Sequence, residues 1–255
     1  MSLPTIVLVP GAWHSPQHYT PLIDALKAQK YEVVSERLPS VGSSTPLDQS
    51  VAKDSAFIKN ALLLPVINGG KDVLLLMHSY GGCPGADAAK DLSKAERQAA
   101  GKKGGIVGLV FMCAFVASEG ASLKSSLPGG VYDPWVIQNN ETGQTTVDNP
   151  KNVFYNDVSD AQAQWAISLL LPHAEHALSS PSGPPAWPDA VFNGKRAYIQ
   201  TENDNTIPFV AQDAMVTYSG VQWDITKLQS GHSPFLSHTK KVADFVAEKA
   251  KAYAS

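Results

Sequence analysis

The most informative stretch of the sequence is an apolar run that leads directly into a serine and two glycines. It reads Asp72-Val73-Leu74-Leu75-Leu76-Met77-His78-Ser79-Tyr80-Gly81-Gly82. A run that is apolar throughout, rather than at alternate positions, is typical of a parallel strand covered on both faces. The glycines favour a tight turn, and a helix is expected from Tyr80 onward. The stretch therefore predicts a strand, a sharp turn that carries Ser79, and a helix.

Similar apolar runs occur along the chain with helical patterns between them. Further strands are expected at residues 5–9, 31–34, 106–115, 197–200 and 221–225. Amphipathic helices are expected at 19–30, 47–64 and 233–252. Strand–helix–strand units connect parallel strands by right-handed crossovers. The order predicts an α/β fold, with an open, doubly wound, mostly parallel sheet of about six strands and helices on both faces.

This alternation stops between residues 119 and 194. The stretch holds turn clusters, scattered aromatic residues and one helical segment at 159–171, and its two lysines and eight acidic residues give it a net charge of −6. The rest of the chain then carries +3 of the total of −3. We expect this insertion, the cap segment, to stand over the carboxyl ends of the strands, where open α/β sheets bind ligands. Residues 1–118 and 195–255 would form the core of one folding unit.

Composition excludes several classes of protein. The 255 residues include 20 Lys and Arg and 23 Asp and Glu, which is not the basic excess of a nucleic-acid-binding domain. Charged residues make up 17% and hydrophobic residues 44%, values that argue against a disordered chain or a coiled coil. We expect no nucleic-acid partner, and the composition leaves the oligomeric state open, with a homodimer as one alternative.

Cysteine usage and the N-terminus bear on the compartment. Cys83 and Cys113 are too few for a disulfide framework and are expected to be buried thiols. Residues 1–4 run into the first strand without a signal-peptide pattern. The longest apolar stretch, 106–117, is shorter than the ~20 residues that span a bilayer. These features predict a cytoplasmic protein that does not enter a membrane.

Ser79 lies in a pattern close to the G-x-S-x-G nucleophile elbow, with Met77 at the position of the first glycine. In such an elbow a strained strand-to-helix turn exposes the serine hydroxyl above the sheet. An ordinary serine turn is the alternative interpretation of the pentapeptide alone. His78 is interpreted as a buried histidine that serves structure through its hydrogen bonds.

A serine nucleophile needs a base, and the base needs a carboxylate that fixes its tautomer. The loop after the fifth expected strand contains Asp204 before Ile207-Pro208, and the loop after the sixth contains His232 in Gly-His-Ser. Each residue alone is as typical of an ordinary turn. Both loops leave strands at the same sheet edge as Ser79, in the order Ser, Asp, His. Asp204 is thus the candidate acid, with Glu202 as the alternative, and His232 the candidate base.

Acyl transfer also needs N–H donors for the developing oxyanion. The first strand ends in Val9-Pro10-Gly11-Ala12-Trp13-His14. A glycine turn there would present the backbone N–H of Ala12 beside that of Tyr80, the residue after the nucleophile. Ala12 and Tyr80 are therefore the candidate oxyanion hole.

These motifs together resemble the α/β-hydrolases, in the branch that includes plant methyl-ester esterases, hydroxynitrile lyases, and fungal and bacterial esterase-like proteins. The resemblance is carried by residues 8–13, 78–82, 204–208 and 231–236. It implies an α/β-hydrolase fold and the triad Ser79, Asp204 and His232, with Ala12 and Tyr80 as the oxyanion hole. Pro10 stands where the family usually has histidine. The lyases resemble one another in a lysine after the histidine, and here that position is Ser233.

The substrate pocket is expected to draw on aromatic residues, for which core packing is the alternative role. The candidates are Trp13 and His14 after the oxyanion turn, and Trp135, Tyr155 and Trp165 of the cap segment. We expect no cofactor and no metal, because the pair His173 and His176 lacks further ligands at metal-binding spacing.

The sequence predicts a serine hydrolase that cleaves a small, largely apolar carboxylic ester or lactone through an acyl-enzyme. A lyase or cyclase with His232 as general base is one alternative, and a non-catalytic small-molecule receptor on the same scaffold is another. Because Ser79 precedes the cap segment while Asp204 and His232 follow it, one site would need both parts of the core.

Overall fold

The computed structural model describes residues 2–255, so Met1, the first residue of the stretch without a signal-peptide pattern, lies outside them. Over this range the main sheet has six strands, all parallel, in the order β2-β1-β3-β4-β8-β9. Their bounds are β1 Thr5–Val9, β2 Val33–Val34, β3 Asp72–His78, β4 Gly105–Met112, β8 Arg196–Thr201 and β9 Asp224–Leu228. The expected doubly wound α/β fold is confirmed.

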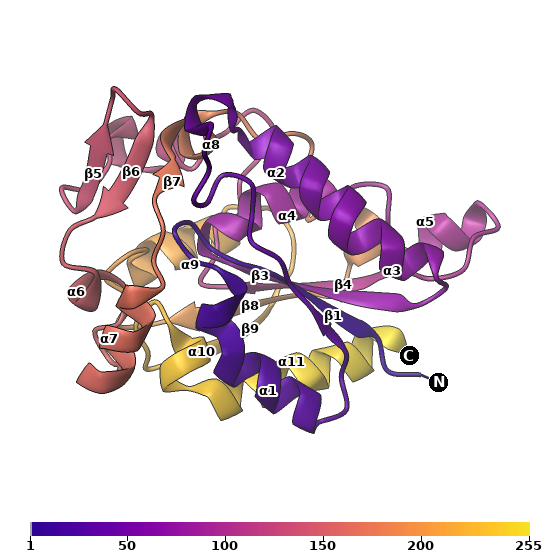
Figure 1. The fold of residues 1–255 in the computed structure, drawn as a ribbon. Helices are drawn as coiled ribbons and strands as arrows, with labels where there is room; N and C mark the ends of the chain where they lie inside the picture. The colour runs from indigo at the N-terminus through magenta and orange to yellow at the C-terminus, as the bar shows by residue number, and fades with distance from the viewer. Residues whose placement is uncertain (1) are drawn as a thin grey trace.

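Helices cover both faces of this sheet (Figure 1). One face carries α1 Thr20–Ala28, α10 Pro234–Ser237 and α11 Thr239–Ala254, and the other carries α2 Val51–Phe57, α3 Leu64–Asn68, α4 Gly82–Ala88 and α5 Lys94–Ala99. A further helix, α9 Phe209–Thr217, packs against β8. Every residue of β1 and β4 is buried, as expected for parallel strands between two helical layers.

Several elements differ from the sequence expectation. The helix expected at 47–64 begins at Val51 and contains a π-helical stretch, Ile58–Leu63, before α3. The helix expected at 233–252 is divided at His238, whose φ of −127° and ψ of 32° are not helical. The last strand begins at Asp224 rather than at residue 221. Its pairing with β8 begins with Ala197 opposite Asp224, near the start of β8 at Arg196, so β9 starts where this pairing starts.

The cap segment lies at one end of the main sheet, on the left in Figure 1. It contains a small antiparallel sheet that the sequence did not predict, with strands β5 Val136–Asn139, β6 Gln144–Val147 and β7 His173–Ala174. Its helices are α6 Pro150–Phe154, α7 Asp160–Ser168 and α8 Glu175–Ser179, and α7 lies within the expected range 159–171. Among residues 2–255 no helix is both long enough and apolar enough to cross a bilayer.

Candidate active site

Ser79 stands on a sharp turn directly after β3 and has a φ of +53°, in the left-handed region. Such a conformation is unfavourable for a residue with a side chain, and it persists only where the surroundings enforce it. The two glycines that follow allow this tight turn because they have no Cβ. A Cβ on Gly81 would lie 2.8 Å from the Val9 carbonyl oxygen. A Cβ on Gly82 would lie 2.2 Å from that of Phe115. The turn is therefore held tightly between the ends of β1 and β4.

Met77 takes the place of the first glycine of the elbow pattern, and the structure shows how its side chain is accommodated. A Cβ built on Gly85, in α4, would lie 2.8 Å from both Cγ and Sδ of Met77. The absence of a side chain at Gly85 thus provides the space that Met77 occupies.

His232 connects the three residues that the sequence singled out. Its Nε2 lies 2.9 Å from Ser79 Oγ, and its Nδ1 lies 2.8 Å from Asp204 Oδ2. An ionised carboxylate only accepts hydrogen bonds, so Nδ1 carries the proton and Nε2 accepts from the serine hydroxyl. Ser79 and His232 are 153 positions apart, and both are buried.

Asp204 is held in place by donors on both carboxylate oxygens. Oδ1 accepts the backbone N–H groups of Thr206, at 2.8 Å, and Ile207, at 2.9 Å. Oδ2 accepts the Thr201 hydroxyl at 2.8 Å and the Gln212 amide at 3.1 Å, in addition to His232. Donors on both oxygens fix the position of the carboxylate and its direction toward His232.

Glu202, the alternative acid, does not reach His232. Its carboxylate accepts a hydrogen bond from the Gln229 side chain at the surface instead. Gln212 is a residue that the sequence analysis missed: it is fully buried on α9, and its amide also donates to the Ile207 carbonyl at 2.7 Å. In the sequence it is marked only by its place on the helix that follows the Asp204 loop.

The two candidate oxyanion donors, the backbone N–H groups of Ala12 and Tyr80, belong to residues close to Ser79. Ala12 lines the same cavity as Ser79, and Tyr80 follows it in the chain. Within residues 2–255 neither backbone N–H donates to a protein acceptor. The Tyr80 side chain points away, and its hydroxyl donates to Asp54 Oδ2 at 2.7 Å. Burial raises the pKa of Asp54 to about 6, although hydrogen bonds from Ser40 and Tyr80 oppose the rise.

His14 lies behind the oxyanion loop and does not line the cavity. Its Nδ1 is 2.7 Å from the Ala12 carbonyl oxygen, and its Nε2 is 2.9 Å from the Tyr155 hydroxyl. A carbonyl only accepts, so Nδ1 bears the proton and Nε2 accepts from Tyr155. Burial lowers the pKa of His14 well below its ordinary value, which keeps the ring neutral and this tautomer in place.

His78 links the oxyanion loop to the loop of His232. Gly11 donates its N–H to the Tyr19 hydroxyl at 2.9 Å, and this hydroxyl donates to His78 Nδ1 at 2.7 Å. His78 Nε2 in turn donates to the His232 carbonyl oxygen at 3.0 Å. Burial lowers the pKa of His78, so the imidazole is neutral. A hydrogen-bonded His78 was predicted from the sequence, whereas the contact with Tyr19 was not.

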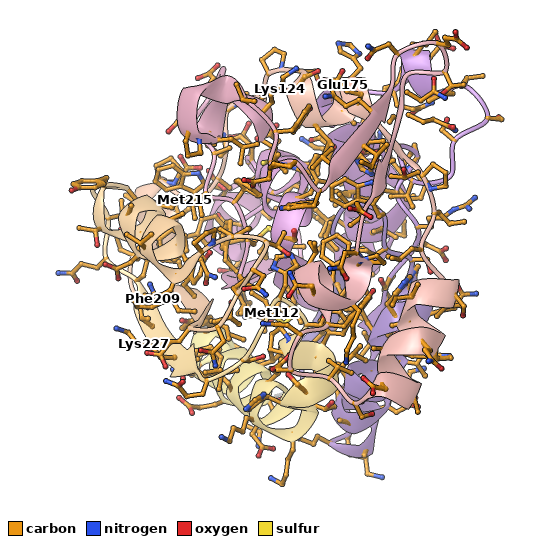
Figure 2. The ribbon with its side chains drawn as sticks, turned by 90° about the vertical axis from the view of Figure 1, so that its left-hand side faces the viewer. Met112, Lys124, Glu175, Phe209, Met215 and Lys227 are labelled. Atoms are coloured by element: carbon orange, nitrogen blue, oxygen red, sulfur yellow. The ribbon has the colours of Figure 1, made fainter. Side chains whose placement is uncertain are left out.

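A small cavity lies beside Ser79, and Ala12, Trp13, Phe115 and Thr206 of the core contribute to its walls. Its walls in the cap segment are mostly apolar and come from Leu123, Leu127, Trp135, Val136 and Leu178. Beside this wall Glu175 accepts hydrogen bonds from Lys124, at 3.3 Å, and from the Tyr132 hydroxyl, at 3.0 Å. Figure 2 shows Lys124 next to Glu175.

The five residues expected in the pocket have different positions. Trp13 and Trp135 line the cavity, whereas Tyr155 is fully buried against His14 and does not line it. Trp165 does not line it either: its side chain is 39% exposed on α7. That helix buries two of its three alanines, Ala163 and Ala166, and directs Trp165 toward solvent.

One grouping of potential metal ligands occurs among residues 2–255, and it consists of His78, Cys113 and His232. Both ring nitrogens of each histidine already have hydrogen-bond partners within the protein. The arrangement therefore serves hydrogen bonding at the site and leaves no imidazole lone pair directed at a shared ion.

Two known proteins are similar in sequence to this chain over nearly its whole length. The chain is 31% identical over 257 residues to "Alpha/beta hydrolase nvfD" of Aspergillus novofumigatus (strain IBT 16806), with 98% of each chain covered. It is 26% identical over 256 residues to "Probable hydrolase R7" of Phoma sp. (strain ATCC 20986 / MF5453), with 98% of this chain and 99% of the relative covered.

Solved structures share the fold over the whole chain. A pyrethroid hydrolase from Sphingobium faniae JZ-2 superposes with a TM-score of 0.70 at 20% identity, covering 99% of each chain. A methylesterase from Arabidopsis superposes with a TM-score of 0.71 at 17% identity, covering 97% of this chain and 99% of that one. A family model described as "Alpha/beta hydrolase family" matches residues 6–245. The chain therefore belongs to the alpha/beta hydrolase family, in agreement with the resemblance expected from its motifs.

Proposed function

We propose that this protein is a serine hydrolase that cleaves a small, largely apolar carboxylic ester or lactone. The observation that carries the proposal is the unbroken series of hydrogen bonds from Ser79 through His232 to Asp204, at 2.9 and 2.8 Å, beside a mostly apolar cavity. A nucleophile, a base and an orienting acid in this geometry are what acyl transfer requires.

The reaction begins when His232 Nε2 takes the proton of the Ser79 hydroxyl and Oγ attacks the ester carbonyl carbon. The backbone N–H groups of Ala12 and Tyr80, which have no other acceptor among residues 2–255, receive the oxyanion. Protonated His232, supported by Asp204, gives its proton to the leaving alcohol. Water, deprotonated by His232, then attacks the acyl-enzyme and releases the acid. A lactone yields a single hydroxy acid by the same steps.

The size and chemistry of the cavity support the choice of substrate. The cavity is small, which favours a small substrate, and its leucine, valine and tryptophan walls favour an apolar one. Structural neighbours described as a methylesterase and as polyneuridine aldehyde esterase support an ester.

The proposal is tested with an active-site-directed fluorophosphonate and intact-mass analysis. We expect stoichiometric labelling of Ser79, loss of labelling in Ser79→Ala, and hydrolysis of short p-nitrophenyl esters or lactones by the wild type only. Ser44→Ala is the matched control, because Ser44 is exposed and outside the cavity. A wild-type protein that is neither labelled nor active would contradict the proposal.

The same variants separate the alternatives. A lyase or cyclase that uses His232 as base without an acyl-enzyme would keep appreciable turnover in Ser79→Ala and lose it in His232→Ala. Ser233 stands where the lyases resemble one another in a lysine, which favours hydrolysis. A receptor would bind a small molecule tightly without turnover.

A further inference from the structure

Trp13 borders two separate hollows. One is the cavity beside Ser79, and the other is an open groove lined, apart from Trp13, by residues of the cap segment. No other residue is common to the walls of these two hollows in the described chain. The groove is mostly apolar and is lined by residues that include Val147, Pro150, Ile167, Leu170 and Leu171.

The Trp13 ring is fixed in this position by its contacts. Its indole N–H lies 3.1 Å from the Thr145 carbonyl oxygen and 3.2 Å from the Thr145 hydroxyl, both in β6. The ring packs edge-on against Trp135 and lies against Phe154, with centroids 5.9 and 5.7 Å away. The Trp13 carbonyl accepts the Leu171 N–H at 3.1 Å. Only 5% of the residue is exposed, and these contacts hold it between the cavity and the groove, both of which it lines.

We propose that Trp13 sets the upper size limit of the substrate and that the groove is an extension of the site which Trp13 closes. The occupant it fits is the far end of a linear alkyl chain whose ester carbonyl lies at Ser79, because the groove is apolar and continues the cavity beyond the indole. The proposal rests on the esterase function proposed above and adds the residue that selects chain length.

The test compares p-nitrophenyl acetate, butyrate, octanoate and decanoate with the wild type and Trp13→Ala. The wild type is expected to lose kcat/KM as the chain lengthens. In Trp13→Ala each methylene that enters the groove is expected to raise kcat/KM roughly fourfold, which is the effect of burying one CH₂ group. The ratio of decanoate to acetate activity should therefore rise by at least tenfold over that of the wild type.

Two further variants make the result specific. Trp165→Ala is the matched tryptophan control, because Trp165 is half-exposed and lines neither hollow, and it should keep the wild-type chain-length profile. Ile167→Trp combined with Trp13→Ala fills the groove from α7 and should reverse the gain for decanoate. Trp13→Leu replaces the indole ring with a smaller apolar side chain, and it takes the place of Trp13→Ala if that variant fails to fold.

The outcomes distinguish this inference from the proposed function. If folded Trp13→Ala or Trp13→Leu hydrolyses acetate without any gain for decanoate, the inference is overturned while the esterase function stands. A wild type that already prefers decanoate also overturns it. A wild type that hydrolyses neither the esters nor lactones, and that does not react with the fluorophosphonate, contradicts the proposed function itself.

Discussion

Tyr155 lies outside the cavity yet acts on the candidate oxyanion hole through His14. Its hydroxyl fixes the tautomer in which His14 Nδ1 donates to the Ala12 carbonyl. We expect Tyr155→Phe to lower kcat by about fivefold with KM changed less than about twofold. Losing one buried hydrogen bond costs ~1 kcal/mol, and we expect this cost mainly in kcat, because the bond holds His14 against the Ala12 carbonyl, beside the N–H proposed to receive the oxyanion. Steady-state kinetics on a short ester measures the division between kcat and KM.

The matched control for this prediction is Tyr218→Phe, because Tyr218 is 87% exposed and makes no contact with the site. A Tyr155→Phe protein that loses thermal stability but keeps the wild-type kcat would assign Tyr155 a purely structural role. Rescue of kcat by Tyr155→His, which restores a donor, would support the positioning role.

Single residues also show what a sequence reveals about a site. Ser79, Asp204 and His232 were predicted because each follows an apolar run and the three occur in a recognisable order. Gln212, Tyr19 and Asp54 were not, because their partners come from other elements: Tyr19 meets His78 across 59 positions, and Asp54 meets Tyr80 across 26. Buried polar side chains of this kind become visible only when tertiary structure places donor and acceptor together.

At the scale of elements, the elbow depends on how β3 packs against α4. Met77 fills the space that a side chain on Gly85 would take. We expect Gly85→Ala to reduce the free energy of unfolding by about 1–3 kcal/mol through overpacking, and Met77→Ala to reduce it by about 2–5 kcal/mol through a cavity. In the double variant the new methyl group partly fills that cavity. The combined loss should therefore be smaller than the sum by about 1 kcal/mol or more.

Urea-induced equilibrium unfolding of the four proteins gives this coupling energy. If the two losses simply add, Met77 and Gly85 do not compensate each other, and the departure from the glycine pattern must be accommodated elsewhere. Labelling of Ser79 by the fluorophosphonate in each variant shows whether the turn itself survives.

The elements were predictable where burial dominates their sequence. The strands β1, β3 and β4 are apolar at nearly every position and were located within a few residues. The edge strand β9 was displaced by three residues, because pairing with β8, rather than its own composition, determines where it starts. The strands β5 and β6 are four residues long, five of their eight residues are polar and only two are buried, so no apolar run marked them.

At the scale of the whole molecule, the cap segment and the core meet at a partly buried carboxylate, that of Asp87. Asp87 of α4 accepts the N–H of Gly183 at 2.6 Å, while its other oxygen is buried without a partner among residues 2–255. Burial raises the pKa of Asp87 to about 6, and the nearby Glu119 adds to the rise. Both Gly183 and Glu119 belong to the cap segment, whose net charge is −6. The acidic excess of the cap segment therefore acts on a core residue.

This shift predicts how stability depends on pH. An unfolded aspartate has a pKa near ~3.9, so between about pH 4 and 6 the native protein retains a proton that the unfolded chain has lost. The Asp87 contribution to stability therefore falls as pH rises through this window, and the full cost is present above pH ~6. We expect Asp87→Asn, which keeps an acceptor for Gly183, to raise the free energy of unfolding by about 1–2 kcal/mol at pH ~7 and by little at pH ~4. Urea unfolding across this range measures the difference.

The matched control is Asp91→Asn, because Asp91 is exposed and the charge change is the same. Its free energy of unfolding should stay within about 0.5 kcal/mol of the wild type. Equal destabilisation of Asp87→Asn at both pH values would instead mean that the hydrogen bond to Gly183 outweighs the cost of burying the charge.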